Sequence, residues 1–157
     1  MTKDITKINL AVERLLENTE NPRHRFMLAA YGRHRYLEVA GRYKEIFEPE
    51  MTVEHPVYRF DLIGQPPLKL DGRDEVEAVY RGWSETDMCI FYIEDETLAV
   101  SDNMIVSRSV LSQQYAGESL AEVGVDDPNA MYLSTSDIAM IWPYDDRGRM
   151  IGEDVWE

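Results

Sequence analysis

The side chains best suited to proton chemistry at neutral pH are the three histidines. An imidazole has an unperturbed pKa of about 6.5, so it can take up a proton and return it under physiological conditions. His55 follows an alternating run and precedes Pro56, and we predict that it acts as a general base. The alternative is a structural histidine at the end of a strand. His34 lies between Arg33 and Arg35, which favours an exposed position.

A tyrosine 24 residues before His55 could assist such a base. The hydroxyl of Tyr31 can donate a hydrogen bond to an oxygen that gains negative charge, if it points into a dry pocket. The alternative is a core tyrosine, because Met27, Tyr31 and His34 share one face of the helix predicted there.

The titratable residues do not follow the spacing of a metal site. The histidines at positions 24, 34 and 55 form no His-x-x-x-His pair and are joined by no carboxylate cluster. The sequence also has no phosphate-binding loop and no dinucleotide fingerprint. We therefore expect chemistry without a metal or a cofactor. The single cysteine, Cys89, cannot form an internal disulfide, which indicates a reducing compartment.

Composition narrows the class of partner. The chain has 157 residues with 30 acids and 16 bases, a net charge of −14. An acidic surface argues against nucleic acid and anionic membranes, which attract basic proteins. No apolar run is long enough to span a membrane, and the N-terminus has no signal-peptide core. We expect a cytoplasmic globular protein that binds a small molecule.

The charge is unevenly distributed. Residues 21–45 contain six bases and two acids, a local charge of +4. One interpretation is a solvated helix face. The other is a positive rim that attracts an anionic substrate or an acidic patch on another subunit.

The hydrophobic pattern changes from helical to alternating near Pro49. We expect helices at 4–18, 22–35, 36–48 and 73–83, and strands at 51–55, 88–100, 104–116, 131–144 and 149–156. Turn residues at 102–103 and 145–148 join successive strands as hairpins. This order predicts an α+β fold with helices packed on one face of a curved sheet.

Three segments resemble the NTF2-like superfamily, in its SnoaL-like and ketosteroid isomerase-like branch. They are IFEPEMTVEHPVY (46–58), GQPPLKLDGRDEV (64–76) and YDDRGRMIGEDVW (144–156). The resemblance implies a cone, in which a bent, mixed or antiparallel sheet and helices on its concave face enclose one deep pocket. It implies an NTF2-like domain at 21–157 after a helical extension at 1–20, and pairing into a homodimer or higher homo-oligomer.

The resemblance also implies roles for individual residues. In the isomerases a helical tyrosine lies 24 residues before the carboxylate base of a Val-Glu-Asp-Pro motif. Here Tyr31 has that place, and His55 replaces the base in Val-Glu-His-Pro (53–56). The isomerases' second donor falls at Met140, which cannot donate. We therefore do not expect steroid isomerisation.

The strands supply further candidates if the family register holds. Arg108, Val110 and Ser112 would then share a pocket-facing side of one strand, and Glu153 would face the pocket from the last strand, together with Val155 and Glu157. Glu153 is predicted to be catalytic, paired with Arg108 or His55. A register off by one residue would reverse these faces. The remaining candidates are Trp83, Ile138, Met140 and Trp142 as pocket wall or core, and Tyr58 and Asp61 as a lid or plain loop.

These residues favour an enzyme that moves a proton on a small, largely apolar, ring-containing substrate, a lyase or dehydratase in preference to an isomerase. A non-catalytic ligand-binding module is the main alternative. Epoxide hydrolysis is less favoured, because its Asp-Arg-Asp group would need an aspartate where Val110 follows Arg108.

Overall fold

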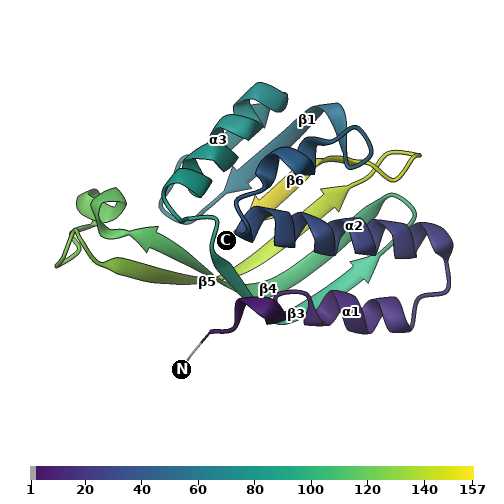
Figure 1. Cartoon of the computed structure of the whole chain (residues 1–157), viewed down its shortest axis with the longest axis horizontal. Coiled ribbons are helices and arrows are strands. Elements are labelled where there is room, and N and C mark those ends of the chain that lie inside the picture. Colours follow the sequence, from purple (N-terminus) through teal and green to yellow (C-terminus); the bar gives the residue numbers. More distant parts are fainter. Residues whose placement is uncertain (1–2) are drawn as a thin grey trace.

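A six-stranded curved sheet forms one layer of the molecule, in a computed structural model that describes residues 3–157 (Figure 1). The strand order is β2-β1-β6-β5-β4-β3, and all neighbours are antiparallel except the parallel pair β1–β6. The strands are β1 (Thr52–Asp61), β2 (Leu68–Asp71), β3 (Phe91–Val100), β4 (Met104–Ala116), β5 (Met131–Pro143) and β6 (Met150–Trp156). The expected α+β class with a curved sheet is confirmed.

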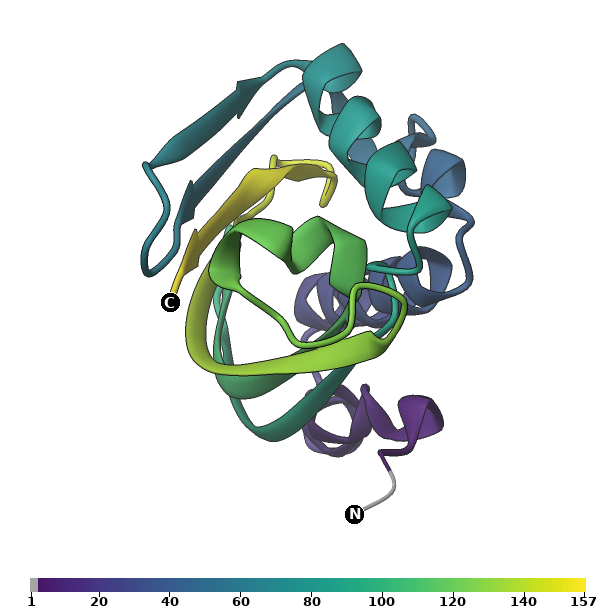
Figure 2. The ribbon, with the colours of Figure 1, turned by 90° about the vertical axis from the view of Figure 1, so that its left-hand side faces the viewer.

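The helices lie on the inner side of this curved sheet, and β4 and β5 extend beyond them as an arm (Figures 1 and 2). The helical segments are η1 (Ile5–Lys7), α1 (Leu10–Glu17), α2 (Pro22–Val39), η2 (Tyr43–Phe47), α3 (Arg73–Glu85) and η3 (Gly117–Val123). None of the helices in residues 3–157 is both long and apolar enough to cross a membrane.

Helix α2 is longer than the sequence pattern suggested. Asn21 caps its start by accepting hydrogen bonds from two backbone amides of the first turn, and Pro22 occupies the first helical position. The helix continues to Val39 and ends before Gly41, whose φ is +67°. The expected boundary at residue 35 is therefore wrong, and Glu38 belongs to α2.

Strand β1 runs through Pro56 instead of ending there. Its pairing with β6 shifts register between Thr52 and Val57, where Gly152 of β6 lies against the β1 backbone. A Cβ on Gly152 would lie 1.8 Å from the carbonyl oxygen of Val57, so only glycine fits. Beyond this irregularity, Tyr58 points inward and Arg59 points outward.

The inner faces of β4, β5 and β6 form one continuous ladder. Ser107 lies opposite Met140, which in turn lies opposite Val155. Ser107 and Ser109 are buried, whereas Arg108 is exposed. The inward face of β4 therefore carries the odd-numbered residues, one position away from the expected register.

Aromatic edge-to-face contacts join the helices to the sheet. Trp142 of β5 packs edge-on against Tyr31 and His34 of α2, with ring centroids 4.8 and 4.9 Å away. Tyr80 of α3 packs similarly against Phe47 and Tyr58. Such pairs contribute about 0.5–1.5 kcal/mol each beyond the area they bury. They hold these side chains of the helices and the sheet in fixed relative positions.

Candidate active site

A cavity of about 490 Å³ lies between the inner face of the sheet and helices α2 and α3. This volume is within the range of small-molecule sites, about 300–1,000 Å³. Side chains of β1, β3, β4, β5, β6 and α3 make most of its wall apolar. Its apolar lining includes Phe60, Trp83, Met88, Phe91, Ile93, Leu111, Ile138, Met140, Trp142 and Val155.

The ionisable side chains in this wall come mostly from α2, α3 and the C-terminal strand. Helix α2 contributes Arg35 and Glu38, α3 contributes Tyr80, β6 contributes Glu153, and Glu157 directly follows β6. Uncharged polar groups and a tyrosine are added by the loop after β1 and by β4 and β5, namely Gln65, Gln113, Tyr115, Ser134 and Ser136. Positions 35 and 38 are three residues apart, so they lie on the same face of α2 and can reach the same space. The parity of β6 turns Glu153 and Glu157 inward while Asp154 points away and bonds Arg59 at 2.9 Å.

Arg35 is the only basic residue that residues 3–157 contribute to the cavity lining, and it is already paired. Its guanidinium makes a bidentate ion pair with Glu96 of β3, in which Nη1 donates to Oε2 at 2.9 Å and Nη2 donates to Oε1. Both side chains are 3% exposed. The guanidinium also donates to the carbonyl of Ile8 at 3.1 Å and to the Tyr31 hydroxyl. The positive charge of Arg35 is thus matched by Glu96.

Tyr31 is part of this buried ion-pair network. Its hydroxyl donates to Glu96 at 3.1 Å, and its side chain is completely buried. Burial raises the pKa of Tyr31 above its ordinary value. The residue is not in the cavity lining, so the structure does not place its hydroxyl where a substrate oxygen would lie.

Glu38 and Glu153 face the cavity without a cation of their own among residues 3–157. Burial raises the pKa of Glu38 to about 8, opposed by the charge of Arg35. Burial, and next the nearby charge of Glu38, raise the pKa of Glu153 well above its ordinary value. Two carboxyl groups that share an apolar space cannot both ionise cheaply. The pair therefore holds protons at neutral pH.

His34 lies beside this pair and is neutral. Its Nε2 is 2.9 Å from the Tyr80 hydroxyl and 3.7 Å from a Glu38 oxygen. Burial, with the charge of Arg35, lowers the pKa of His34 to about 3. A neutral imidazole can hold the Tyr80 hydroxyl in place without adding a charge that would ionise Glu38.

Together these groups can perform acid–base chemistry. A protonated carboxyl can donate to a substrate oxygen, and a carboxylate in apolar surroundings is a stronger base than one in water. Groups of three or more His, Cys, Asp or Glu that could hold a metal do not occur in the described part of the chain.

His55, the predicted base, lies outside the cavity. Its side chain is 70% exposed, and its Nε2 is 2.8 Å from Asp71. Its ring also lies close to Gly72, where a Cβ would be 3.0 Å from the His55 Cε1. The reason is strand alternation: Phe60 of β1 lines the cavity, and His55 has the opposite parity. The expected placement of His55 is therefore corrected.

Five of the predicted pocket residues also lie elsewhere. Arg108 is exposed and pairs with Asp137, instead of with Glu153. Val110 and Ser112 share its parity, and Ser112 bonds Thr135 at 2.9 Å. Tyr58 is buried beneath the lining, and Asp61 is exposed at the end of β1. The residues that the structure does place in the lining are Trp83, Ile138, Met140, Trp142, Val155, Glu153 and Glu157.

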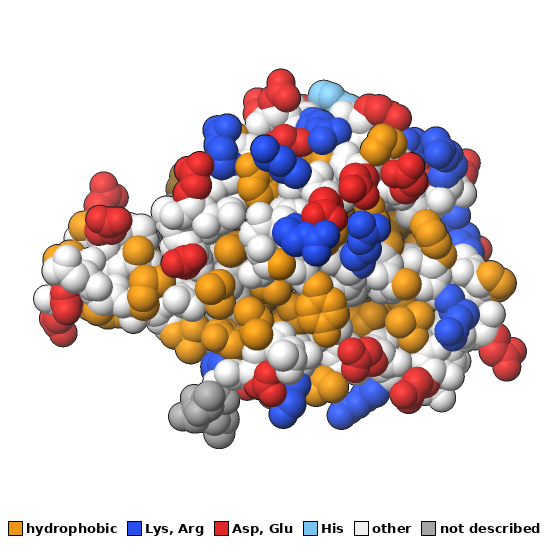
Figure 3. Space-filling view, in the orientation of Figure 1, with side chains coloured by type: hydrophobic (Ala, Val, Ile, Leu, Met, Phe, Trp, Pro, Cys, Tyr) orange, Lys and Arg blue, Asp and Glu red, His pale blue; other side chains and the backbone are white. Residues whose placement is uncertain are grey.

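The basic segment 21–45 does not form a rim at the cavity. Arg23 donates to backbone carbonyls near residues 102 and 145–146, and Arg42 pairs with Glu45 on the surface. Basic and acidic side chains alternate over the helical side of the molecule (Figure 3). The solvated-face interpretation fits most of these bases, and the expected positive rim is not found.

Arg35, Glu38 and Tyr80 are ionisable lining residues that the sequence reasoning did not assign to the site. The period that joins Met27, Tyr31 and His34 continues to Glu38 if the helix runs on. That signal was hidden by the assumed helix boundary at residue 35. For Tyr80, the helix 73–83 was expected, but its inward face was not assigned.

No protein-family model and no curated protein sequence matches the chain. Several solved structures do. A putative polyketide cyclase from Xanthomonas campestris pv. campestris superposes with a TM-score of 0.60 and 11% identity, covering 86% of this chain and 92% of that chain. A putative SnoaL-like polyketide cyclase from Jannaschia sp. CCS1 gives a TM-score of 0.59 and 15% identity, covering 87% of this chain and 88% of that chain.

A third solved structure is that of SalBIII, described as an epoxide hydrolase/cyclase-like enzyme in pyran ring formation in the polyether salinomycin. It gives a TM-score of 0.58 and 14% identity, covering 83% of this chain and 88% of that chain. The chain therefore has the NTF2-like, SnoaL-like fold. At these identities the likeness is one of fold, and the reaction has to be argued from the cavity.

Proposed function

We propose that the protein is an enzyme that moves a proton on a small, largely apolar, ring-containing molecule, with Glu38 and Glu153 as its acid–base pair. The observation that carries this proposal is the pair itself: two nearly buried carboxyl groups that face an apolar cavity and, within the described residues 3–157, have no cation of their own. Carboxyl groups placed in this way lower the stability of the folded protein, because burial disfavours their charged form. Such groups concentrate at functional sites.

The pair can supply both partners of a proton transfer. Near neutral pH the protonated carboxyl donates to a carbonyl or hydroxyl oxygen of the substrate, and the other, once ionised, removes a proton from carbon. Repulsion between the two negative charges keeps the second proton in place after the first has left. Tyr80, held by His34, lies in the same lining and can hydrogen-bond the same substrate oxygen.

Among the candidate reactions, a lyase or dehydratase reaction is the one that needs both carboxyl groups. Loss of water needs an acid to protonate the departing hydroxyl and a base to take a proton from the neighbouring carbon, which are two separate groups. A double-bond shift needs only one group that carries a proton between two carbons. Epoxide hydrolysis through Arg108 is not supported, because Arg108 lies on the exposed face of β4. The named cyclases with this fold also fit acid–base chemistry on ring-forming molecules.

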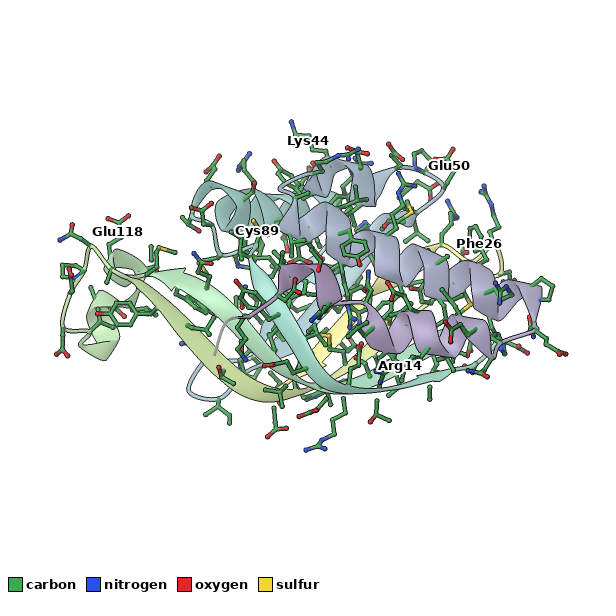
Figure 4. The ribbon with its side chains drawn as sticks, turned by 60° about the horizontal axis from the view of Figure 1, so that its bottom comes forward. Arg14, Phe26, Lys44, Glu50, Cys89 and Glu118 are labelled. Carbon is green, nitrogen blue, oxygen red and sulfur yellow. The ribbon has the colours of Figure 1, made fainter. Side chains whose placement is uncertain are left out.

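Replacing either carboxyl should remove the reaction. On a panel of cyclic ketones and β-hydroxy aromatic compounds, we expect Glu38→Gln and Glu153→Gln to lower kcat/KM by about 100-fold to 10,000-fold, the usual contribution of an acid or base. Turnover is followed by NMR in D2O, which detects both product and deuterium at the exchanging carbon. Glu50→Gln, at an exposed position at the edge of the molecule (Figure 4), is the matched control and should keep full activity.

His55→Ala distinguishes this proposal from the histidine base predicted from the resemblance. We expect this variant to turn over the panel as the parent does, because its ring lies outside the cavity. Loss of turnover in His55→Ala with full activity in Glu38→Gln and Glu153→Gln would refute the carboxyl pair. Binding of panel compounds without turnover in the parent would identify a ligand-binding module instead.

A further inference from the structure

The cavity has more acids than bases in its wall. Arg35 is neutralised by Glu96 through two hydrogen bonds between nearly buried groups. The remaining ionisable carboxyl groups of the lining are Glu38, Glu153 and, on the C-terminal side of β6, Glu157. The lining contains no second lysine or arginine, so within the described residues nothing balances a charge on Glu38 or Glu153.

Glu153 in particular is unpartnered. It is 6% exposed, and in residues 3–157 neither a hydrogen bond nor an ion pair of its carboxyl group with another residue is found. Its carboxyl lies on the inward face of β6, in the lining of the cavity. Buried polar groups in folded proteins nearly always have a partner. A carboxyl aimed into a cavity without one indicates that its partner is brought by a ligand.

We infer that the cavity binds a ring-bearing amine in its protonated form, with the ammonium group between Glu38 and Glu153. This inference rests on the proposed acid–base role of the pair and names the chemical class of its substrate. An ammonium supplies the missing positive charge and up to three donors to the two carboxyl groups. An anionic substrate, which the basic segment 21–45 had suggested, would meet the uncompensated carboxyl groups and is disfavoured.

The aromatic lining supports the same occupant. Tyr80, Trp83 and Phe60 form a chain of edge-to-face contacts, with Tyr80 and Trp83 centroids 5.3 Å apart and Phe60 and Trp83 centroids 6.3 Å apart. All three residues line the cavity. Aromatic rings stack on a ligand ring and attract a cation placed over their faces. An amine attached to a ring system would use both parts of the wall.

Binding of the amine should release a proton. The ammonium brings one positive charge, so one of the two carboxyl groups loses its proton to solvent and the other keeps it. The carboxyl that keeps its proton remains available as the acid of the reaction. Other titratable groups near the pair also influence its protonation. They are His34 and Arg35 on α2, Tyr58 on β1, Tyr80 on α3, Cys89 before β3, Tyr144 after β5 and Asp154 on β6. His34 is neutral and Arg35 is charged at pH 7, where the titrations described next are made.

Three matched probes test this inference. They are 2-(naphthyl)ethylamine, which is cationic at pH 7, 2-(naphthyl)ethanol, which is neutral, and the carboxylate naphthaleneacetate, which is anionic. By titration calorimetry at pH 7 we expect the amine to bind at least about tenfold more tightly than the alcohol, the value of one charge-assisted hydrogen bond. We expect no measurable binding of the acetate. Titrations in buffers of different ionisation enthalpy should report the release of about one proton per amine bound.

The double variant Glu38→Gln, Glu153→Gln should lose the preference for the amine and the proton release while still binding the alcohol, and Glu50→Gln should retain both. Binding of the alcohol as tight as that of the amine, or preference for the acetate, would overturn the inference. These titrations need no turnover, so their failure is separate from that of the proposed reaction. Turnover of neutral ketones with no amine preference would leave the acid–base pair in place and reject only the amine.

Discussion

Replacing Arg35 by methionine is expected to destabilise the protein by about 3–5 kcal/mol, the usual effect of breaking a buried ion pair from one side. Methionine has a similar length and keeps the apolar contacts of the side chain. It leaves Glu96, whose side chain is 3% exposed, without its cation, and it removes the donor to the carbonyl of Ile8. Glu96 must then be buried as an unpaired charge or be protonated, and both cost free energy.

Urea denaturation followed by circular dichroism measures this loss. The double variant Arg35→Met, Glu96→Gln should recover at least about half of it, because no charge is left unpaired. Arg42→Met is the control, since the Arg42 side chain is 62% exposed in its pair with Glu45, and it should leave the stability nearly unchanged because solvent screens such a pair. Equal losses for Arg35→Met and Arg42→Met would show that the buried pair does not organise the site.

The second large effect is on the pH dependence of stability. Glu38 has an ordinary pKa near 4.5 when unfolded and a pKa of about 8 when folded. Between these values the folded protein holds a proton that the unfolded chain releases. Rising pH therefore favours unfolding, by up to about 1.4 kcal/mol per pH unit for each such group. Glu153 has the same sign, because its pKa is also raised.

His34 has the opposite effect at lower pH. Folding lowers its pKa from 6.5 to about 3, so between these values the unfolded chain binds a proton that the folded protein does not. The free energy of unfolding therefore rises as the pH is raised from 3 to 6.5. The decrease due to the carboxyl pair is therefore clearest between pH 6.5 and 8. Denaturant titrations across this range should show the free energy of unfolding of the parent falling with pH, with a smaller decrease in Glu38→Gln. Equal pH profiles for the two proteins would contradict the raised pKa of Glu38.

Much of the fold could be predicted from sequence patterns. Alternation and turn residues located the strands of the β3–β4 and β5–β6 hairpins, and proline positions located the start of α2. The parity of β6 was also correct, which placed Glu153 and Glu157 inward. These features are local, because each depends on a turn and the few residues beside it.

The features that could not be predicted depend on contacts between distant segments. The face of β4 that points inward is set by its pairing with β5 and the helices above, and counting from the turn at 102–103 gave the opposite face. The outward position of His55 depends on β1 continuing past Pro56 beside Gly152, 97 residues away. Glu38 was not identified as a site residue, because its neighbours along the chain carry no information about Glu153, which lies 115 residues away in the sequence.

The protonation of the carboxyl pair is measured most directly by NMR. The carboxyl carbon shifts of Glu38 and Glu153, assigned with the two Glu→Gln variants, would be followed from pH 4 to pH 10. We predict that Glu38 titrates at about pH 8, and that the resonance of Glu153 is still that of a protonated acid at pH 7. If both groups instead titrate near 4.5, the cavity holds two ordinary carboxylates, and they cannot act as the proton donor that the proposed reaction requires.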